Sequence, residues 1–264
     1  MTVWLFRAGK QGEFENKFLD DDRIYLTWDD LNINLEKVNS KEALYKQLIN
    51  HYDLEKEKTA INWSSQIWPI AHSMVKGDLV VLPSKFNRTI HIGEVNGEYV
   101  YDESLGSPYY HYRNVNWFAK DIPRDRFDQD ILYSLGAFMT VCKIKRNKAE
   151  ERIREMRNNN WHVPKNKKVN ELVEENEEAA SIDLDEYIYD QISERIIQRF
   201  KGHKMENLVE EILKAKGFTT YRSPEGADNG VDILAASNTL GFGDPKICVQ
   251  VKTSDTPLDR PTLD

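Results

Sequence analysis

The run Gly226-Ala-Asp-Asn-Gly-Val-Asp-Ile-Leu234, followed by Cys248-Val-Gln-Val-Lys252, decides how the C-terminal part of this chain is expected to fold. Asp232 stands at the entrance of an apolar run. Gln250 and Lys252 alternate with valines, so a strand there would place both polar side chains on one face of a sheet. Glycines and a proline break the chain between the two runs. The pattern therefore predicts two strands, joined by a loop, that bring Asp232 beside Gln250 and Lys252.

This trio has the chemistry of a metal-assisted hydrolytic site. A carboxylate, an amide oxygen and an ammonium group around one point can hold a hard cation and position a water molecule. Each residue alone has a plainer interpretation, because Lys252 could be a surface lysine and Asp228-Asn229-Gly230 is an ordinary turn sequence. The conjunction, and not any single member, favours a site.

The residues before the trio predict a helix and a strand. Residues 205–216 are amphipathic, with apolar side chains at helical spacing, and Gly217 follows as a helix-ending glycine. Glu206 lies in the first turn of this helix. Residues 218–221 then predict a strand that leads into the glycine-rich turn.

The ordered set resembles the Mrr-like restriction endonuclease domain, a branch of the PD-(D/E)XK nucleases. The resemblance covers roughly residues 202–264 and rests on Glu206, Gly217-Phe218, Gly226-x-Asp228-x-Gly230-x-Asp232 and Gln250-x-Lys252. It implies an α/β endonuclease module that uses Mg²⁺, for which Mn²⁺ can substitute, and that acts on double-stranded DNA.

The resemblance also implies a role for each matching residue. Asp232 corresponds to the metal-binding aspartate. Gln250 stands where most of these enzymes have an acidic residue and would be the second metal ligand, since glutamine is a variant of the Mrr-like branch. Lys252 corresponds to the lysine that orients or polarises the attacking water, Glu206 to a helix glutamate that supports the metal, and Asp228 to an upstream acidic position that forms a turn or contacts DNA.

The sequence departs from the family at its end. Domains of this family continue with a helix and a further strand, whereas this sequence stops at Asp264, soon after Lys252. We therefore expect an incomplete module whose apolar strand surface is left uncovered. A shortened chain, a degraded gene, and completion by a partner or by homodimerisation are the alternatives.

The first part of the chain predicts a small β-rich domain over residues 1–145. Short β-rich runs are separated by Gly, Asn and Pro turns, and Asn96-Gly97 is typical of a type I′ hairpin. The expected strands are 2–8, 23–28, 76–83, 89–95, 98–101, 110–118 and 141–145, and the expected helices are 40–51, 63–74 with a break near Pro69, and 127–140.

This part resembles the PUA-like or EVE-like barrel domains that are fused to modification-dependent nucleases. The similarity rests on residues 3–9, 77–83, 92–101 and 113–117. It implies a pocket that accepts a base flipped out of duplex DNA and reads its modification. Trp28, Trp63 and Trp68 are the first candidates for the pocket wall, with Arg7, Lys85, Arg88 and Arg113 as candidates for phosphate contacts. The alternative is that the aromatic residues are core and the cations are solvated.

Residues 146–201 are predicted to be a helical and acidic linker between the two domains. A charged helix is expected over 149–156 and an amphipathic helix over 188–200. Residues 171–186 are strongly acidic and contain no basic residue. A solvated face or linker is the plain interpretation, and a DNA-mimicking or autoinhibitory segment is the alternative.

The bulk composition limits the choice of function. The chain has 264 residues, a formal net charge of −8 and only two cysteines, which have no metal-ligand spacing. These values argue against a uniformly basic nucleic-acid coat and a structural zinc site, and they fit a reducing cytosol. No apolar run suits a signal peptide or a membrane span.

The sequence thus predicts an α+β and α/β protein with a recognition barrel, a helical linker and a PD-(D/E)XK module. The first functional hypothesis is a modification-dependent, type IV-like restriction endonuclease. A non-catalytic protein that binds modified bases or nucleic acid is the second. A phage-defence effector nuclease that another signal activates is the third.

Overall fold

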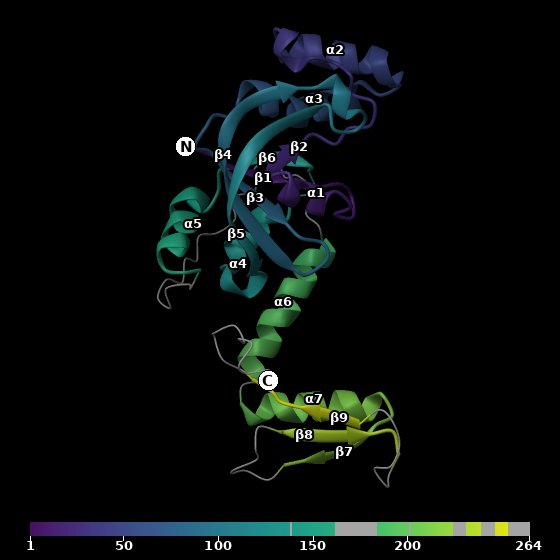
Figure 1. The fold of residues 1–264 in the computed structure, drawn as a ribbon, viewed down its shortest axis with the longest axis vertical. Coiled ribbons are helices and arrows are strands. Elements are labelled where there is room, and N and C mark those ends of the chain that lie inside the picture. The colour runs from purple at the N-terminus through teal and green to yellow at the C-terminus, as the bar shows by residue number, and fades with distance from the viewer. Residues whose placement is uncertain (138, 162–183, 201, 224–230, 239–245, 253–264) are drawn as a thin grey trace. The chain divides into compact units, whose positions relative to one another are not determined.

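The computed structural model describes residues 1–137, 139–161, 184–200, 202–223, 231–238 and 246–252 (Figure 1). The chain divides into two compact units, Met1–Asp190 and Gln191–Asp264. The N-terminal unit therefore extends beyond the expected 1–145 and takes in α5 (Ala149–Asn158) and the beginning of α6 (Leu184–Arg199). Buried α5 side chains and ion pairs made by α6 join both segments to this unit.

The N-terminal unit is built on a six-stranded mixed sheet with the order β2-β5-β4-β3-β1-β6. β1 and β3 pair in parallel, and the other neighbours are antiparallel. The predicted mixture of helices and strands is confirmed, but the pairings of the described residues do not include one between the edge strands β2 and β6, which would close a barrel. The strands are β1 (Val3–Phe6), β2 (Arg23–Tyr25), β3 (Leu79–Pro83), β4 (Thr89–Tyr101), β5 (His111–Pro123) and β6 (Val141–Ile144).

Helices cover both faces of this sheet, so the unit has three layers and two apolar cores (Figure 1). Strand β1 is apolar on both faces because the sheet is covered on both sides. Its side chains Trp4 and Phe6 pack in one core, Val3 and Leu5 pack in the other, and all four are buried. The first core is covered by α1 (Glu15–Asp20), α2 (Lys41–Tyr52) and α3 (Glu57–His72), and the second by α4 (Gln129–Leu135) and α5.

The predicted hairpin at Asn96-Gly97 is wrong. β4 continues through these residues, and the register shifts between Val95, opposite Val115, and Tyr99, opposite Arg113. Neither Asn96 nor Gly97 has the positive φ that a type I′ turn requires. The stretch is instead a β-bulge, and the chain reverses later, around the 3₁₀ turn η2 (Glu103–Leu105).

The predicted helices α2 and α3 are present, whereas the predicted break at Pro69 is not. Ser40 caps α2, because its Oγ accepts a hydrogen bond from Ala43 N at 3.0 Å. α3 begins earlier than expected, and the predicted break at Pro69 is wrong because the helix runs on to His72. Two further 3₁₀ turns, η1 (Leu35–Lys37) and η3 (Arg124–Arg126), complete the short elements of this unit.

The described part of the C-terminal unit contains the rest of α6, α7 (His203–Ala215) and an antiparallel sheet in the order β7-β8-β9 (Figure 1). Its strands are β7 (Thr219–Arg222), β8 (Ile233–Ala236) and β9 (Lys246–Val249), and α7 packs against β7 and β8. Ile233 and Ala235 are buried, whereas Leu234, on the other face, is 43% exposed. Tyr221, Leu234 and Cys248 lie next to one another across the three strands, and all three are exposed.

Candidate active site and nucleic-acid interface

Asp232 lies directly before β8, and its backbone is hydrogen-bonded to the chain next to β7 and to β9. Its backbone N–H donates to Val249 O at 2.9 Å, and its carbonyl oxygen accepts from Ser223 N at 2.9 Å. Its carboxylate Oδ2 accepts from Val251 N at 2.5 Å. The side chain is therefore anchored to the segment that follows β9, and the structure brings Asp232 beside the Gln250–Lys252 sequence as predicted.

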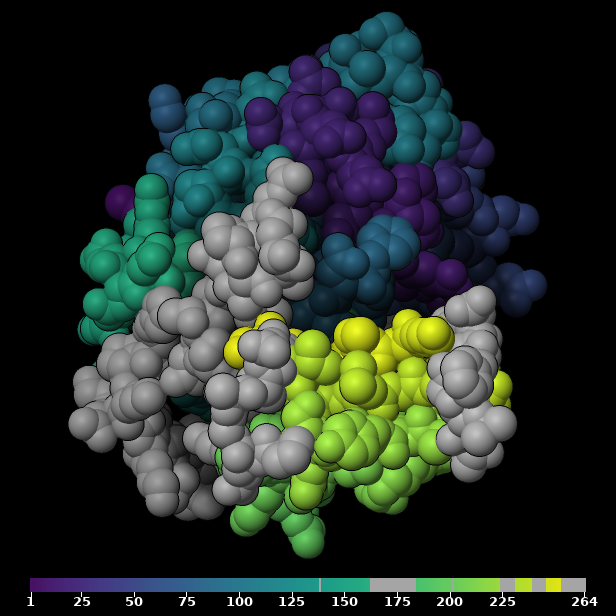
Figure 2. All heavy atoms as spheres, turned by 60° about the horizontal axis from the view of Figure 1, so that its bottom comes forward, coloured from purple at the N-terminus to yellow at the C-terminus, as the bar shows by residue number. Residues whose placement is uncertain are grey.

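Gln250 and Lys252 lie just beyond the end of β9 and not within a strand, because the ladder of β8 stops at Val249. The alternation nevertheless continues: both side chains are exposed, and Val251 between them is half-buried. Residues 246–252, coloured yellow, lie at the surface in the space-filling view (Figure 2). Both polar groups are thus accessible to a ligand from solvent.

The donor set fits a hydrated hard cation. Asp232 Oδ1 has no hydrogen-bond donor within the described part of the chain, and Gln250, which precedes the Val251 that binds Asp232, offers an amide oxygen. Mg²⁺ is commonly held by one or two carboxylates, with water completing its octahedron. Replacement of a carboxylate by Gln250 removes one negative charge, so the site should bind the cation more weakly than a two-carboxylate site would.

The other two acidic candidates are not brought to this point by the described contacts. Glu206 lies on α7, where its Oε1 is 2.9 Å from His203 Nδ1, one turn earlier in the same helix. Asp228 lies outside the described residues. No cluster of three or more His, Cys, Asp or Glu side chains suitable for a metal occurs in the ranges that the structure describes.

Two of the three candidate tryptophans lie together in the N-terminal unit. The Trp28 and Trp63 ring centroids are 6.4 Å apart, and Tyr52 packs edge-on against Trp63 at 5.3 Å. Trp68 is separate and stacks on His72 at 3.6 Å. All three tryptophans are half-buried at the edge of the first core, so their faces are only partly available to a base.

The arginine candidates divide into two groups. Arg113 is only 2% exposed, and it donates to Ile70 O at 2.5 Å and to Gly97 O at 3.0 Å. It therefore ties the last turn of α3 to the β4 bulge, and its burial leaves no face for a phosphate. Burial also lowers the pKa of its guanidinium. Arg7 and Arg88 lie on another surface, where both make ion pairs with α6.

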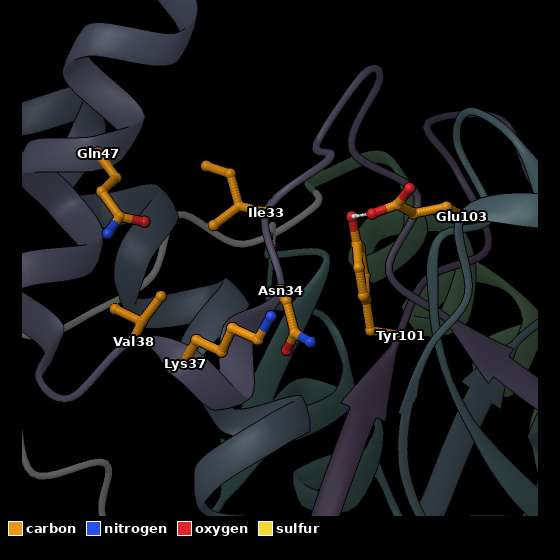
Figure 3. Close-up of a pocket in the computed structure, with 7 residues that line it drawn as sticks. All are labelled: Ile33, Asn34, Lys37, Val38, Gln47, Tyr101 and Glu103. Atoms are coloured by element: carbon orange, nitrogen blue, oxygen red, sulfur yellow. Dashed lines mark hydrogen bonds between the residues drawn. The ribbon is translucent and has the colours of Figure 1, made fainter.

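A pocket of about 340 Å³ lies where residues 33–38 face the end of β4 (Figure 3). Tyr101 and Glu103 form one side, and the Tyr101 hydroxyl donates to Glu103 Oε1 at 2.8 Å. Burial and this carboxylate raise the pKa of Tyr101 to about 12. The lining residues are Ile33, Asn34, Lys37, Val38, Gln47, Tyr101 and Glu103.

Sequence reasoning missed this pocket because none of the candidate tryptophans lines it. Of the lining residues, Asn34 has a local sequence role that points to this turn. Its side chain accepts a hydrogen bond from Glu36 N at 3.0 Å and so caps η1. The rest of the pocket depends on bringing α2 and β4 together, which no local pattern specifies.

A buried hydrogen-bonded chain holds the segment that lines the pocket. Leu35 N donates to the Tyr99 hydroxyl at 3.2 Å, and that hydroxyl lies 2.8 Å from His111 Nδ1. The Nε2 atom of His111 lies 2.7 Å from Leu31 O, so the proton of the neutral ring belongs on Nε2. Desolvation lowers the pKa of this fully buried imidazole to about 4.

Comparison with protein families matches residues 4–144 to the family described as Domain of unknown function (DUF8426). The chain belongs to the DUF8426 family. Residues 197–264 match a second family, described as a restriction endonuclease. Neither characterised proteins nor solved structures give a match to this chain.

Each match lies within one of the two compact units. The DUF8426 match runs from β1 to β6 and so spans the whole six-stranded sheet and the pocket. The restriction endonuclease match contains Glu206, Asp232, Gln250 and Lys252, and it supports the predicted Mrr-like nuclease module. This second match supports a nuclease-type enzyme, and a restriction endonuclease domain implies DNA as the substrate. Across the described residues, no helix is long and apolar enough to cross a lipid bilayer.

Proposed function

We propose that this protein is a modification-dependent, type IV-like restriction endonuclease. The DUF8426 domain would recognise modified double-stranded DNA, and the C-terminal module would hydrolyse its phosphodiester bonds with Mg²⁺, or with Mn²⁺ in its place. One observation carries the proposal: within the restriction endonuclease match, the Asp232 carboxylate is anchored to Val251 N, between Gln250 and Lys252. A cytoplasmic location is part of the same proposal.

The chemistry assigned to the site follows from its residues. Asp232 and Gln250 would hold the cation through oxygen atoms. When bound, the cation lowers the pKa of a coordinated water and offsets charge on the phosphate. The Lys252 ammonium group would donate a hydrogen bond to the attacking water and stabilise the negative charge that develops during attack. The Val251 N–H holds Asp232 Oδ2, which would leave Oδ1 to bind the cation.

Recognition is assigned to the pocket in the DUF8426 domain. Its volume of about 340 Å³ falls in the range of small-ligand sites. The amides of Asn34 and Gln47 offer donors and acceptors for a base edge, while Ile33 and Val38 offer apolar wall for an added methyl group. The Trp28 and Trp63 rings remain candidates for stacking, as proposed from the sequence.

Cleavage of matched duplexes tests this function. Duplexes that carry cytosine, 5-methylcytosine or 5-hydroxymethylcytosine at the same positions would be incubated with the full chain and Mg²⁺. The proposal expects cleavage of at least one modified duplex well above that of the unmodified one. Equal cleavage of all three would contradict recognition of the modification, and absence of cleavage with either Mg²⁺ or Mn²⁺ would contradict the hydrolytic function.

A non-catalytic DNA-binding protein is the second candidate. Its supporting observation is that the described site contains a single carboxylate, Asp232, next to a neutral Gln250. Titration with Mn²⁺ followed by electron paramagnetic resonance separates the two candidates. Binding that is lost in Asp232→Ala supports the enzyme, and no binding in the wild-type chain favours the non-catalytic protein.

A further inference from the structure

Four cationic side chains gather on the N-terminal unit, away from the pocket. We call Arg7, Lys85, Arg88 and Arg124 the cationic cluster. They come from separate places in the chain: the end of β1, the loop between β3 and β4, and η3. Their shared partners are Glu186 and Asp190, which lie four residues apart and so on one side of α6.

The contacts within this cluster are close and directed. Arg124 makes a bidentate ion pair with Asp190, in which Nε donates to Oδ1 at 2.9 Å and Nη2 donates to Oδ2 at 2.5 Å. Arg88 Nη2 reaches the same carboxylate at 3.0 Å. Lys85 Nζ lies 2.7 Å from Glu186 Oε1, and Arg7 Nη1 lies 3.6 Å from that oxygen.

Ion pairs hold this part of α6, together with an edge-on contact between the Tyr187 and Tyr133 rings at 5.9 Å and the Arg88 guanidinium over the Tyr189 ring at 4.9 Å. The residues between the two carboxylates expose their apolar side chains: Tyr187 is 37% exposed, Ile188 51% and Tyr189 58%. Salt weakens the more exposed ion pairs that Lys85 and Arg88 make with α6, so an anionic ligand can replace α6 there at moderate cost. The buried pair of Arg124 and Asp190 is screened much less and resists exchange most strongly.

The chemistry of the cluster suits phosphate. A guanidinium fork binds carboxylate and phosphate in the same bidentate geometry. Between Lys85 and Arg88 lies Phe86, which is 59% exposed, and the Ser84 hydroxyl shapes this loop by accepting from Phe86 N at 3.1 Å and Asn87 N at 3.3 Å. Cations that flank an exposed aromatic ring are typical of nucleic-acid surfaces, where the ring packs on sugar or base.

We propose that the cationic cluster is a binding surface for the phosphates of duplex DNA, and that Glu186 and Asp190 occupy it as competing carboxylates in the free protein. This inference rests on the proposed function for the identity of the ligand. DNA binding and the docking of α6 would then exclude each other at this surface. Both the cluster and the two carboxylates lie within Met1–Asp190, so the competition needs no other part of the chain.

Neutralisation of the two carboxylates tests the competition. The variant Glu186→Gln/Asp190→Asn keeps the size of both side chains and removes their negative charges from the cluster. If about two more phosphate contacts form, the affinity for duplex DNA at 0.15 M salt should rise on the order of 10- to 30-fold, and the slope of log K against log salt should steepen by about 2. Fluorescence anisotropy with a labelled duplex in EDTA measures both quantities without cleavage.

Two comparisons separate competition from a general charge effect. Asp185→Asn/Glu194→Gln removes the same charge from α6 without touching the cluster, and it should raise the affinity much less. The changes Lys85→Ala and Arg88→Ala should cost little affinity in the wild-type chain, where the carboxylates already engage these cations. In the Glu186→Gln/Asp190→Asn chain the same two changes should abolish most of the gain.

Hydrogen exchange on the unaltered chain provides a readout that does not depend on any variant. Addition of duplex DNA should speed amide exchange over residues 184–190. Unchanged or slower exchange there would overturn the inference, and so would an equal gain in affinity for both charge-neutralised variants or no DNA binding by any variant. The proposed function fails separately, by loss of metal-dependent cleavage, so the two failures are distinguishable.

Discussion

Acid should destabilise the N-terminal unit through His111. Its ring is fully buried and neutral, with Nε2 against Leu31 O and Nδ1 against the Tyr99 hydroxyl, and desolvation lowers its pKa to about 4. In the unfolded chain the imidazole has a pKa of about 6.5. The unfolded state therefore binds more protons between these two values, and the stability contributed by His111 is lost as the pH falls from about 6.5 to about 4.

The size of this loss follows from the difference between the two pKa values. About 2.5 pKa units at 1.36 kcal/mol each correspond to roughly 3 kcal/mol when the titration is complete. At pH 5, about 2 kcal/mol of this should already be lost, while most aspartate and glutamate side chains are still ionised. A loss of this size is a large part of the stability of a typical domain.

Urea unfolding followed by tryptophan fluorescence at pH 7.5 and pH 5.0 measures the effect. All six tryptophans lie in the N-terminal unit, so the signal reports on that unit alone. His111→Gln removes the titrating group and should lower the stability at pH 7.5 but flatten its dependence on pH. Tyr99→Phe removes a hydroxyl from the same chain of hydrogen bonds, keeps the imidazole, and should preserve most of the slope.

Equal slopes for the wild-type and His111→Gln chains would refute the reasoning. Direct titration of the His111 ring by NMR gives an independent check, since a resonance that shifts with a midpoint near 6.5 in the folded chain would contradict the neutral buried state.

Three further predictions concern Arg113, Asp78 and the two cysteines. Arg113→Met should lower the stability by about 2–4 kcal/mol, because it leaves backbone carbonyls of α3 and of the bulge buried without donors; thermal unfolding measures this, and a change below ~0.5 kcal/mol would contradict it. Asp78→Ala should cost a similar ~2–4 kcal/mol, because three N–H groups, including Trp4 Nε1 at 2.9 Å, donate to its carboxylate. Cys248 is exposed, whereas burial raises the pKa of the Cys142 thiol to about 11, so a thiol reagent at pH 7.5 should label Cys248 first and Cys142 slowly; equal rates would contradict that difference.

Local patterns predicted the parts of the fold that local physics decides. The apolar run that forms β1, the helix expected over 40–51 and the amphipathic face of α7 each depend on residues close in sequence. The predicted approach of Asp232 to the Gln250–Lys252 run is confirmed, because two short strands in register suffice to place the carboxylate at Val251 N. The role of these residues in a nuclease site stays a prediction.

The predictions were wrong where contacts between segments far apart in the sequence determine the conformation. Asn96-Gly97 has ideal hairpin composition, but pairing with β5 on both sides of it keeps β4 extended and turns the pair into a bulge. The sequence suggested that Arg113 contacts phosphate, but its guanidinium is buried and donates to Ile70 O of α3. The pairing of Glu186 and Asp190 with the cationic cluster spans up to 179 residues of sequence, between Arg7 and Glu186, and no spacing rule could have revealed it.

The central claim is that Asp232 and Lys252 belong to one metal-dependent nuclease site. The most direct test is the initial rate of duplex cleavage with Mg²⁺ for the wild-type chain, Asp232→Ala, Lys252→Ala and the control Lys246→Ala, whose lysine is exposed on β9 of the same sheet. The account predicts that Asp232→Ala and Lys252→Ala lower the rate by about 10²-fold or more, while Lys246→Ala stays near the wild-type rate. Cleavage at wild-type rates by Asp232→Ala or Lys252→Ala would contradict it.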